Sequence, residues 1–210
     1  MKYRIYQESR NAAWDLLIKE QVRTLPVQVG AICRHMGFAV FSYAVGKNLI
    51  AYYGLANHAR RTDGFTVRAG DDITIFYDQT KPDGRNRFTI AHELGHIVLG
   101  HLGNRQVTAI NREQAPGDDP RETAANIFAA RLLAPSCVLW GMHVQTAEEI
   151  ANVCHISHHA AEIRAKRMQL LYAREHQFLQ TRGKSCFLQH PKERRVYEQF
   201  RAYIEHYKSG

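Results

Sequence analysis

The sequence lacks the features of a membrane protein or of a small secreted protein held by disulfides. No apolar run approaches the length needed to cross a bilayer, and residues 1–6 show no apolar signal-peptide core. The four cysteines are far apart and form no Cys-x-x-Cys pair, which argues against a disulfide framework and against a thiolate zinc site. We therefore expect buried or partly buried free thiols and a cytoplasmic location.

Internal repeats and low-complexity tracts are also absent, and the composition is ordinary for a folded chain, with 45% hydrophobic and 23% charged residues. The net charge of +8 is uneven, because residues 162–210 carry eleven Lys and Arg against five Asp and Glu. A basic C-terminal tail of this kind is either a solvated helical face or a surface for nucleic acid or an acidic partner.

The hydrophobic pattern predicts an α+β fold. Apolar residues at helical spacing predict a first helix around Trp14 and Val22 and a second over residues 29–36. Short runs rich in aromatic and β-branched residues, separated by glycines, predict a small antiparallel sheet from residues 38–45, 49–53, 65–68 and 73–77. Further helices are predicted at residues 86–99, 121–134, 146–154, 157–171 and 191–207.

One helix of this set carries the motif His92-Glu93-Leu94-Gly95-His96. Residues four apart share a face of an α-helix, so His92 and His96 can both direct a ring nitrogen at one metal ion. Glu93 lies one residue round the helix, where it reaches a metal-activated water rather than the metal. The motif therefore predicts a zinc site with Glu93 as general base, although manganese can occupy histidine–carboxylate sites too.

Catalytic zinc usually takes a third protein ligand. His101 is a poor fit, because it lies five residues past His96 on a helix that ends near Gly100. Glu122 opens the next predicted helix and is the favoured ligand, with Asn126 one turn later on the same face, where it could hydrogen-bond a ligand histidine. Acidic residues of the intervening loop remain alternatives: Glu113, Asp118 and Asp119.

The two motif segments, residues 87–96 and 122–135, together resemble the ImmA/IrrE family of metallopeptidases, and residues 64–75 resemble the strands that precede the motif there. The resemblance covers about residues 25–172 and departs at Ala134, where members often carry Met. It implies a zincin-like α+β core, which we place at residues 1–135, followed by a helical portion at 136–210.

The resemblance also implies a function. His92, His96 and Glu122 would be the zinc ligands and Glu93 the base in the hydrolysis of a peptide bond. The typical substrate of the family is a helix-turn-helix transcriptional repressor of a mobile element or a stress regulon. A second donor to the oxyanion is expected, and His101, His143 and several tyrosines are unranked candidates.

A different function is suggested by residues 146–171, which have the outline of a helix-turn-helix pair with Ser157 as a helix cap. Arg164, Lys166 and Arg167 could then contact DNA phosphates. The alternative hypothesis is therefore a DNA-binding regulator with a structural or vestigial metal site. A third hypothesis is a toxin-like or antitoxin-associated component of a genetic module, in which proteolysis regulates a neighbour. Because any packed helical hairpin has the same outline, direct DNA binding is not the favoured interpretation.

Overall fold

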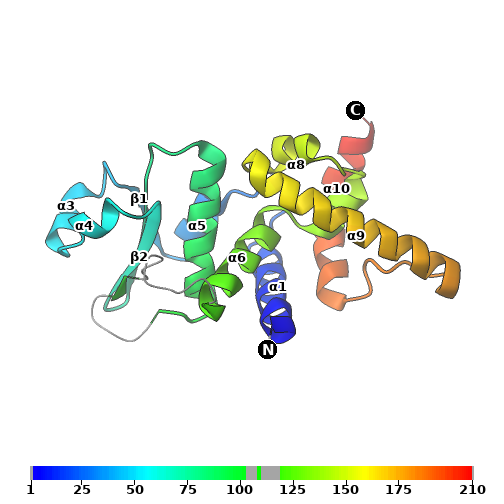
Figure 1. The fold of residues 1–210 in the computed structure, drawn as a ribbon, viewed down its shortest axis with the longest axis horizontal. Coiled ribbons are helices and arrows are strands. Elements are labelled where there is room, and N and C mark those ends of the chain that lie inside the picture. The colour runs from blue at the N-terminus through cyan, green and yellow to red at the C-terminus, as the bar shows by residue number, and fades with distance from the viewer. Residues whose placement is uncertain (1, 103–107, 110–118, 210) are drawn as a thin grey trace. The chain divides into compact units, whose positions relative to one another are not determined.

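The computed structural model describes residues 2–102, 108–109 and 119–209 and is a mixed α+β fold, as the sequence predicts (Figure 1). The chain divides into two compact units, Met1–Ser9 with Gln28–Ala129 and Arg10–Val27 with Ala130–Gly210. Helix α1 (Lys2–Lys19) and helix α6 (Pro120–Leu133) contribute residues to both units. The domain boundary at residues 135/136 stays a prediction.

The first unit contains a four-stranded sheet in the order β1-β3-β2-β4. Its strands are β1 (Ala39–Ser42), β2 (Gly64–Ala69), β3 (Asp72–Tyr77) and β4 (Thr108–Ala109). Strand β2 pairs antiparallel with β3 and β4, but β1 pairs parallel with β3, so the prediction of an antiparallel sheet is wrong for that pair. The chain between β1 and β3 passes through two short helices and β2, which lets it return in the same direction.

Helix α3 (Lys47–Tyr52) and helix α4 (Ala56–Ala59) lie on one side of the sheet, and α5 lies on the other (Figure 1). The prediction of a strand at residues 49–53 is wrong, because this segment lies largely in α3. Ile50 is buried against Phe65 and Phe76, while Leu49 and Tyr53 pack beside it, so the apolar side chains follow the helical period. Packing on the sheet thus overrides the strand propensity of this aromatic segment.

Helix α5 (Asp83–Val98) covers the opposite face of the sheet and carries the metal-binding motif. Its central residues, from Thr89 to His96, are buried. Helix α2 (Val29–His35) also contacts α5, and both helices occur close to their predicted positions. The motif helix is therefore held by the sheet on one side and by other helices elsewhere, which fixes the direction of its side chains.

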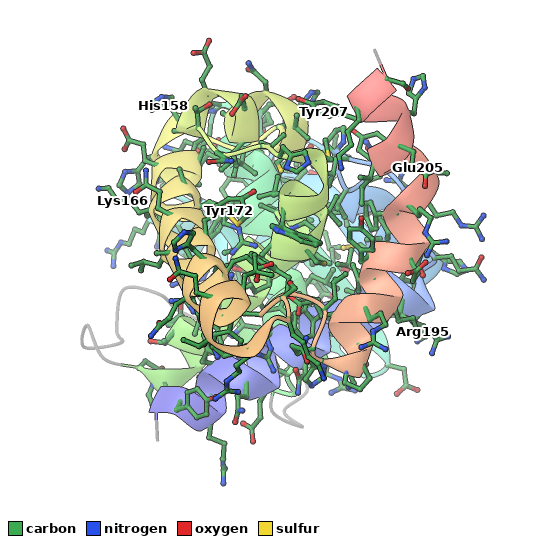
Figure 2. All side chains as sticks on the ribbon, turned by 90° about the vertical axis from the view of Figure 1, so that its right-hand side faces the viewer. His158, Lys166, Tyr172, Arg195, Glu205 and Tyr207 are labelled. Carbon is green, nitrogen blue, oxygen red and sulfur yellow. The ribbon has the colours of Figure 1, made fainter. Side chains whose placement is uncertain are left out.

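The second unit is helical. Besides the parts of α1 and α6, it contains α7 (Ser136–Met142), α8 (Ala147–Cys154), α9 (His158–Arg182) and α10 (Pro191–Ser209). Figure 2 shows α9 with His158, Lys166 and Tyr172 labelled, and α10 with Arg195, Glu205 and Tyr207. Helix α7 is absent from the sequence-based prediction, and α9 continues past the predicted end at residue 171 because no glycine or proline interrupts it before Gly183.

Contacts within the second unit join segments far apart in the sequence. The side-chain amide of Gln199 on α10 donates to the carbonyl oxygens of Leu17 (2.8 Å), near the end of α1, and of Val22 (2.6 Å), three residues after that end. The indole of Trp140 on α7 stacks on Phe187, with 4.9 Å between the ring centroids. Helix α10 therefore contacts both α7 and the chain around the end of α1.

One stretch of the described residues, Pro120–Met142, is long and apolar enough to cross a membrane by length and composition, which departs from the sequence-based expectation. However, 78% of its apolar window is buried inside the structure, as in the core helix of a globular protein.

The prediction for the cysteines is confirmed, because all four are free, with Cys33, Cys137 and Cys154 buried and Cys186 partly so. Burial raises the pKa of the Cys33 thiol to about 12, so this sulfur is a poor nucleophile at neutral pH.

Candidate metal centre

The two histidines of the motif lie on the buried face of α5, one turn apart. Each is 1% exposed, and the distance between their Nε2 atoms is 2.9 Å. Two lone pairs held at this distance repel one another unless a cation or a proton lies between them. The backbone of α5 therefore places two nitrogen donors at a single point, as the spacing of the motif predicts.

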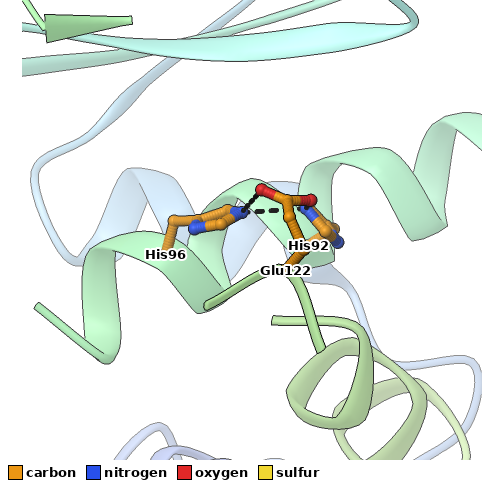
Figure 3. A group of neighbouring side chains, drawn as sticks. All are labelled: His92, His96 and Glu122. Atoms are coloured by element: carbon orange, nitrogen blue, oxygen red, sulfur yellow. Dashed lines mark hydrogen bonds and ion pairs between the residues drawn. The ribbon is translucent and has the colours of Figure 1, made fainter. Parts of the chain in front are cut away.

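Glu122 completes the group from the first turn of α6 (Figure 3). Its Oε2 atom lies 3.2 Å from Nε2 of His92, and its Oε1 atom lies 3.1 Å from Nε2 of His96. When the two imidazoles are protonated on Nε2, the hydrogen bonds that they donate hold the pKa of this carboxyl well below its usual range. Glu122 is thus an anionic oxygen donor facing both rings, and these three residues are the one group among the described residues that could hold a metal ion.

The close approach of α6 to α5 depends on small residues. At Gly95, an added Cβ atom would lie 3.3 Å from the Cα and O atoms of Ala125 and 3.0 Å from Cδ1 of Phe128. Any larger residue at this position would push the two helices apart. Gly95 of the motif and Ala125, three residues after Glu122, therefore allow the carboxylate to reach the histidines.

Hydrogen bonds on the far side of each imidazole fix its orientation. The Nδ1 atom of His92 lies 2.9 Å from Oδ1 of Asn126, so it must carry the proton that this oxygen accepts. Nδ1 of His96 lies 2.9 Å from Nδ1 of His101. Asn126 lies where the sequence suggested, and in the neutral imidazole its bond leaves Nε2 of His92 unprotonated, which a metal ligand requires.

The donor set fits a zinc ion. Zn–N bonds of ~2.0–2.1 Å in a tetrahedron place neighbouring donors roughly 3.3 Å apart. The separations here are 2.9, 3.1 and 3.2 Å, slightly shorter than this value. Two neutral imidazoles and one carboxylate are also the donors that catalytic zinc takes in one class of peptidases, with a fourth position left for water or substrate. The donor set thus fits this class of metal site, and manganese remains an alternative to zinc.

Glu93 lies beside the histidines on the sheet-facing side of α5. The residue is 2% exposed, and its Oε2 atom accepts a hydrogen bond of 2.8 Å from Oγ1 of Thr66 on β2. Thr66 is itself fully buried. The sheet therefore holds the carboxylate of Glu93 in one orientation, which a proton-transferring group needs.

The other residues considered from the sequence take different places. Asp119 accepts a hydrogen bond of 2.8 Å from the backbone N–H of Arg121, so it caps the start of α6. His143 belongs to the second unit and is exposed. The remaining loop acids, Glu113 and Asp118, lie outside the described residues.

Two contacts of the site are missing from the sequence-based prediction: Thr66 on Glu93, and His101 on His96. No local pattern marks Thr66, because only the sheet register and the packing of α5 bring it to Glu93. His101 was considered as a ligand or an oxyanion donor, and the structure places it behind a ligand instead. Burial and then the neighbouring His96 lower the pKa of its imidazole to about 4.

Comparison with known proteins identifies the family of the chain. A family model described as the IrrE N-terminal-like domain (peptidase family M78) matches residues 33–166, which include the sheet, the motif helix and Glu122. No curated protein matches the chain. The match covers more than half of the sequence, so the resemblance suggested by its motifs is confirmed and the chain belongs to this peptidase family, with the IrrE N-terminal-like domain.

Proposed function

We propose that the protein is a zinc-dependent endopeptidase with a zincin-like core, and that it cleaves a helix-turn-helix transcriptional repressor at a specific site. The observation that carries the proposal is the convergence of Nε2 of His92, Nε2 of His96 and the carboxylate of Glu122 at one point. A bound zinc ion would supply a Lewis acid that polarises the scissile carbonyl and lowers the pKa of a coordinated water toward ~7.

The residues of the chain take separate parts in this reaction. His92, His96 and Glu122 hold the cation, while Asn126 orients His92 through its hydrogen bond. Glu93 is the proposed general base, which takes a proton from the attacking water and passes it to the leaving amine. Its buried position and its bond to Thr66 support this assignment, because a fixed carboxylate beside the metal has little freedom to adopt unproductive orientations.

The substrate is proposed from the family and from the second unit. Helices α8 and α9 form the helix pair expected from the sequence, with Thr146 and Ser157 as their N-caps. Arg164, one of the three residues offered as phosphate contacts, is 5% exposed, and its guanidinium donates to the carbonyl of Ala134 and to the hydroxyl of Ser136. This burial favours a role of the pair in protein recognition over operator reading.

The test pairs metal analysis with cleavage. Purified wild-type protein is expected to contain one zinc per chain and to cleave the repressor encoded beside its gene when the two are co-expressed. Glu93→Gln should keep the metal and lose cleavage, because the amide cannot accept the proton. His92→Ala should lose both.

Each result bears on a separate part of the proposal. Cleavage by the metal-loaded Glu93→Gln variant would remove Glu93 as the base. Intact repressor in the presence of stoichiometric metal would count against the substrate assignment. Binding of operator DNA that weakens steeply with salt would favour the alternative, a DNA-binding regulator.

A further inference from the structure

The C-terminal end of α5 folds the chain back onto one of the metal ligands. Gly100 has a left-handed backbone, with φ of 72°. The backbone N–H of Gly100 bonds to the carbonyl of Ile97 at 3.1 Å, and the N–H of His101 bonds to the carbonyl of His96 at 2.9 Å. These are the two bonds of a Schellman motif, in which the residue after the glycine packs on the last full turn of the helix.

This cap therefore brings two imidazoles together by local geometry. The rings of His96 and His101 meet at an angle of 66°, with 5.0 Å between their centroids, and their Nδ1 atoms are 2.9 Å apart. The contact is to the nitrogen of His96 that points away from Glu122, whose oxygen lies near Nε2. His101 thus meets the back of the ligand ring rather than the metal position.

Only one proton arrangement of this pair is compatible with metal binding. If His101 donates from Nδ1, neutral His96 carries its own proton on Nε2, and that nitrogen has no lone pair for a cation. If Nδ1–H of His96 donates to His101, Nε2 of His96 presents a lone pair beside Nε2 of His92. The second arrangement repeats what the oxygen of Asn126 imposes on His92.

We infer that His101 is a positioning residue for the metal centre: as a hydrogen-bond acceptor on Nδ1 of His96, it holds this ligand in the tautomer and orientation that bind the cation. The inference rests on the metal-binding part of the proposed function and is independent of the substrate. It also gives a role to the pair Gly100-His101, which has the wrong spacing to supply a third ligand.

The experiment measures zinc affinity by competition with a chromophoric chelator. Loss of an outer hydrogen bond to a metal ligand typically costs about 10- to 100-fold in affinity, and this loss is expected for His101→Ala. His101→Asn should stay within roughly threefold of the wild type, because Oδ1 of asparagine can replace Nδ1 as the acceptor. His176→Ala, which removes an exposed histidine of α9, is the matched control and should bind zinc like the wild type.

A second measurement needs no metal. Two-bond ¹H–¹⁵N spectra are recorded on the metal-free protein with Glu122→Ala in every variant, because the carboxylate 3.1 Å away would otherwise attract the proton to Nε2 of His96. The spectra should show His96 protonated on Nδ1 when residue 101 is His or Asn, and a mixture of tautomers in His101→Ala. Far-UV circular dichroism reports whether each variant keeps the helical content of the wild type.

The outcomes separate the inference from the proposed function. Zinc affinity of folded His101→Ala equal to that of the wild type would overturn the inference, as would His101→Asn binding as weakly as His101→Ala. Failure of the wild-type protein to bind zinc would remove the proposed function. In that case, the spectra still decide the role of His101, because an unchanged tautomer of His96 in His101→Ala refutes it.

Discussion

Substitution of Gly95 by alanine tests whether the close packing of α5 and α6 holds the third ligand in place. The new Cβ atom would lie 3.3 Å from Cα and O of Ala125 and 3.0 Å from Cδ1 of Phe128. Carbon atoms in packed interiors lie about 3.5–4.0 Å apart. The backbone of Ala125 cannot rotate out of the way, so we expect the helices to separate by roughly 0.4 Å, the shortfall from this packing distance.

This separation would reach Glu122, one turn before Ala125 on the same helix. Metal–ligand distances vary by only about 0.2 Å around their preferred values, so the shift is larger than the site tolerates. We expect zinc affinity to fall roughly tenfold, which corresponds to ~1.4 kcal/mol. The overpacking costs about 1–3 kcal/mol of folding free energy, and the better helix propensity of alanine offsets about 1 kcal/mol of that cost.

The assays are chelator competition for zinc and urea unfolding of the metal-free protein. Gly30→Ala on α2 is the matched control, because a Cβ atom there meets only the end of the flexible Arg34 side chain at 3.6 Å. The control should keep its zinc affinity and should not lose stability. If Gly95→Ala behaves like Gly30→Ala in both assays, the packing argument is refuted.

Three further substitutions probe separate contacts. Thr66→Val should lower the cleavage rate while leaving the metal content unchanged. It should also cost about 1.5–3 kcal/mol of unfolding free energy, because buried Glu93 loses a hydrogen bond. Cleavage at the wild-type rate would contradict the role of Thr66 in holding Glu93. Burial raises the pKa of Glu193, so its ionisation costs stability as the pH rises from the unfolded-state value through the folded-state value. Glu193→Gln should therefore gain stability relative to the wild type as the pH rises above about 4 in urea unfolding, and a pH-independent difference would disagree. Thr146→Ala removes the capping box with Glu149 and should cost about 1 kcal/mol at neutral pH. Hydrogen bonds from Thr146 lower the pKa of Glu149, so the stability lost in Thr146→Ala should shrink as the pH falls through this lowered pKa. Thermal unfolding of both proteins at neutral and acidic pH measures the difference.

The parts of the site that follow from local geometry were predictable from the sequence. The spacing of His92 and His96 determines a shared helix face, and the apolar residues around them indicate a buried helix. Glu122 and Asn126 could be predicted as site residues because they lie on one face of a second helix whose start is clear in the sequence. In each case, the information lies within one turn of a helix.

The parts that depend on tertiary packing were not predictable in the same way. The segment around Ile50 has strand-like composition, yet it is helical because its apolar side chains pack on one face of the sheet. Thr66 meets Glu93 only through the placement of α5 on β2. His101 is an intermediate case, since Gly100 marks a helix end in the sequence, but the hydrogen bond between His101 and His96 is known only from the distance between their Nδ1 atoms.

The three proposed ligands differ in how much of the fold they need. His92 and His96 lie four residues apart, so a short helical segment brings them together, whereas Glu122 approaches only when α6 packs on α5. A complete site therefore exists only in the native protein, and metal at about 100 times its dissociation constant would add ~2.7 kcal/mol to the folding free energy. The zinc supply of the cell would then govern how long each copy survives degradation, so that scarcity of the metal removes the protein as well as its activity.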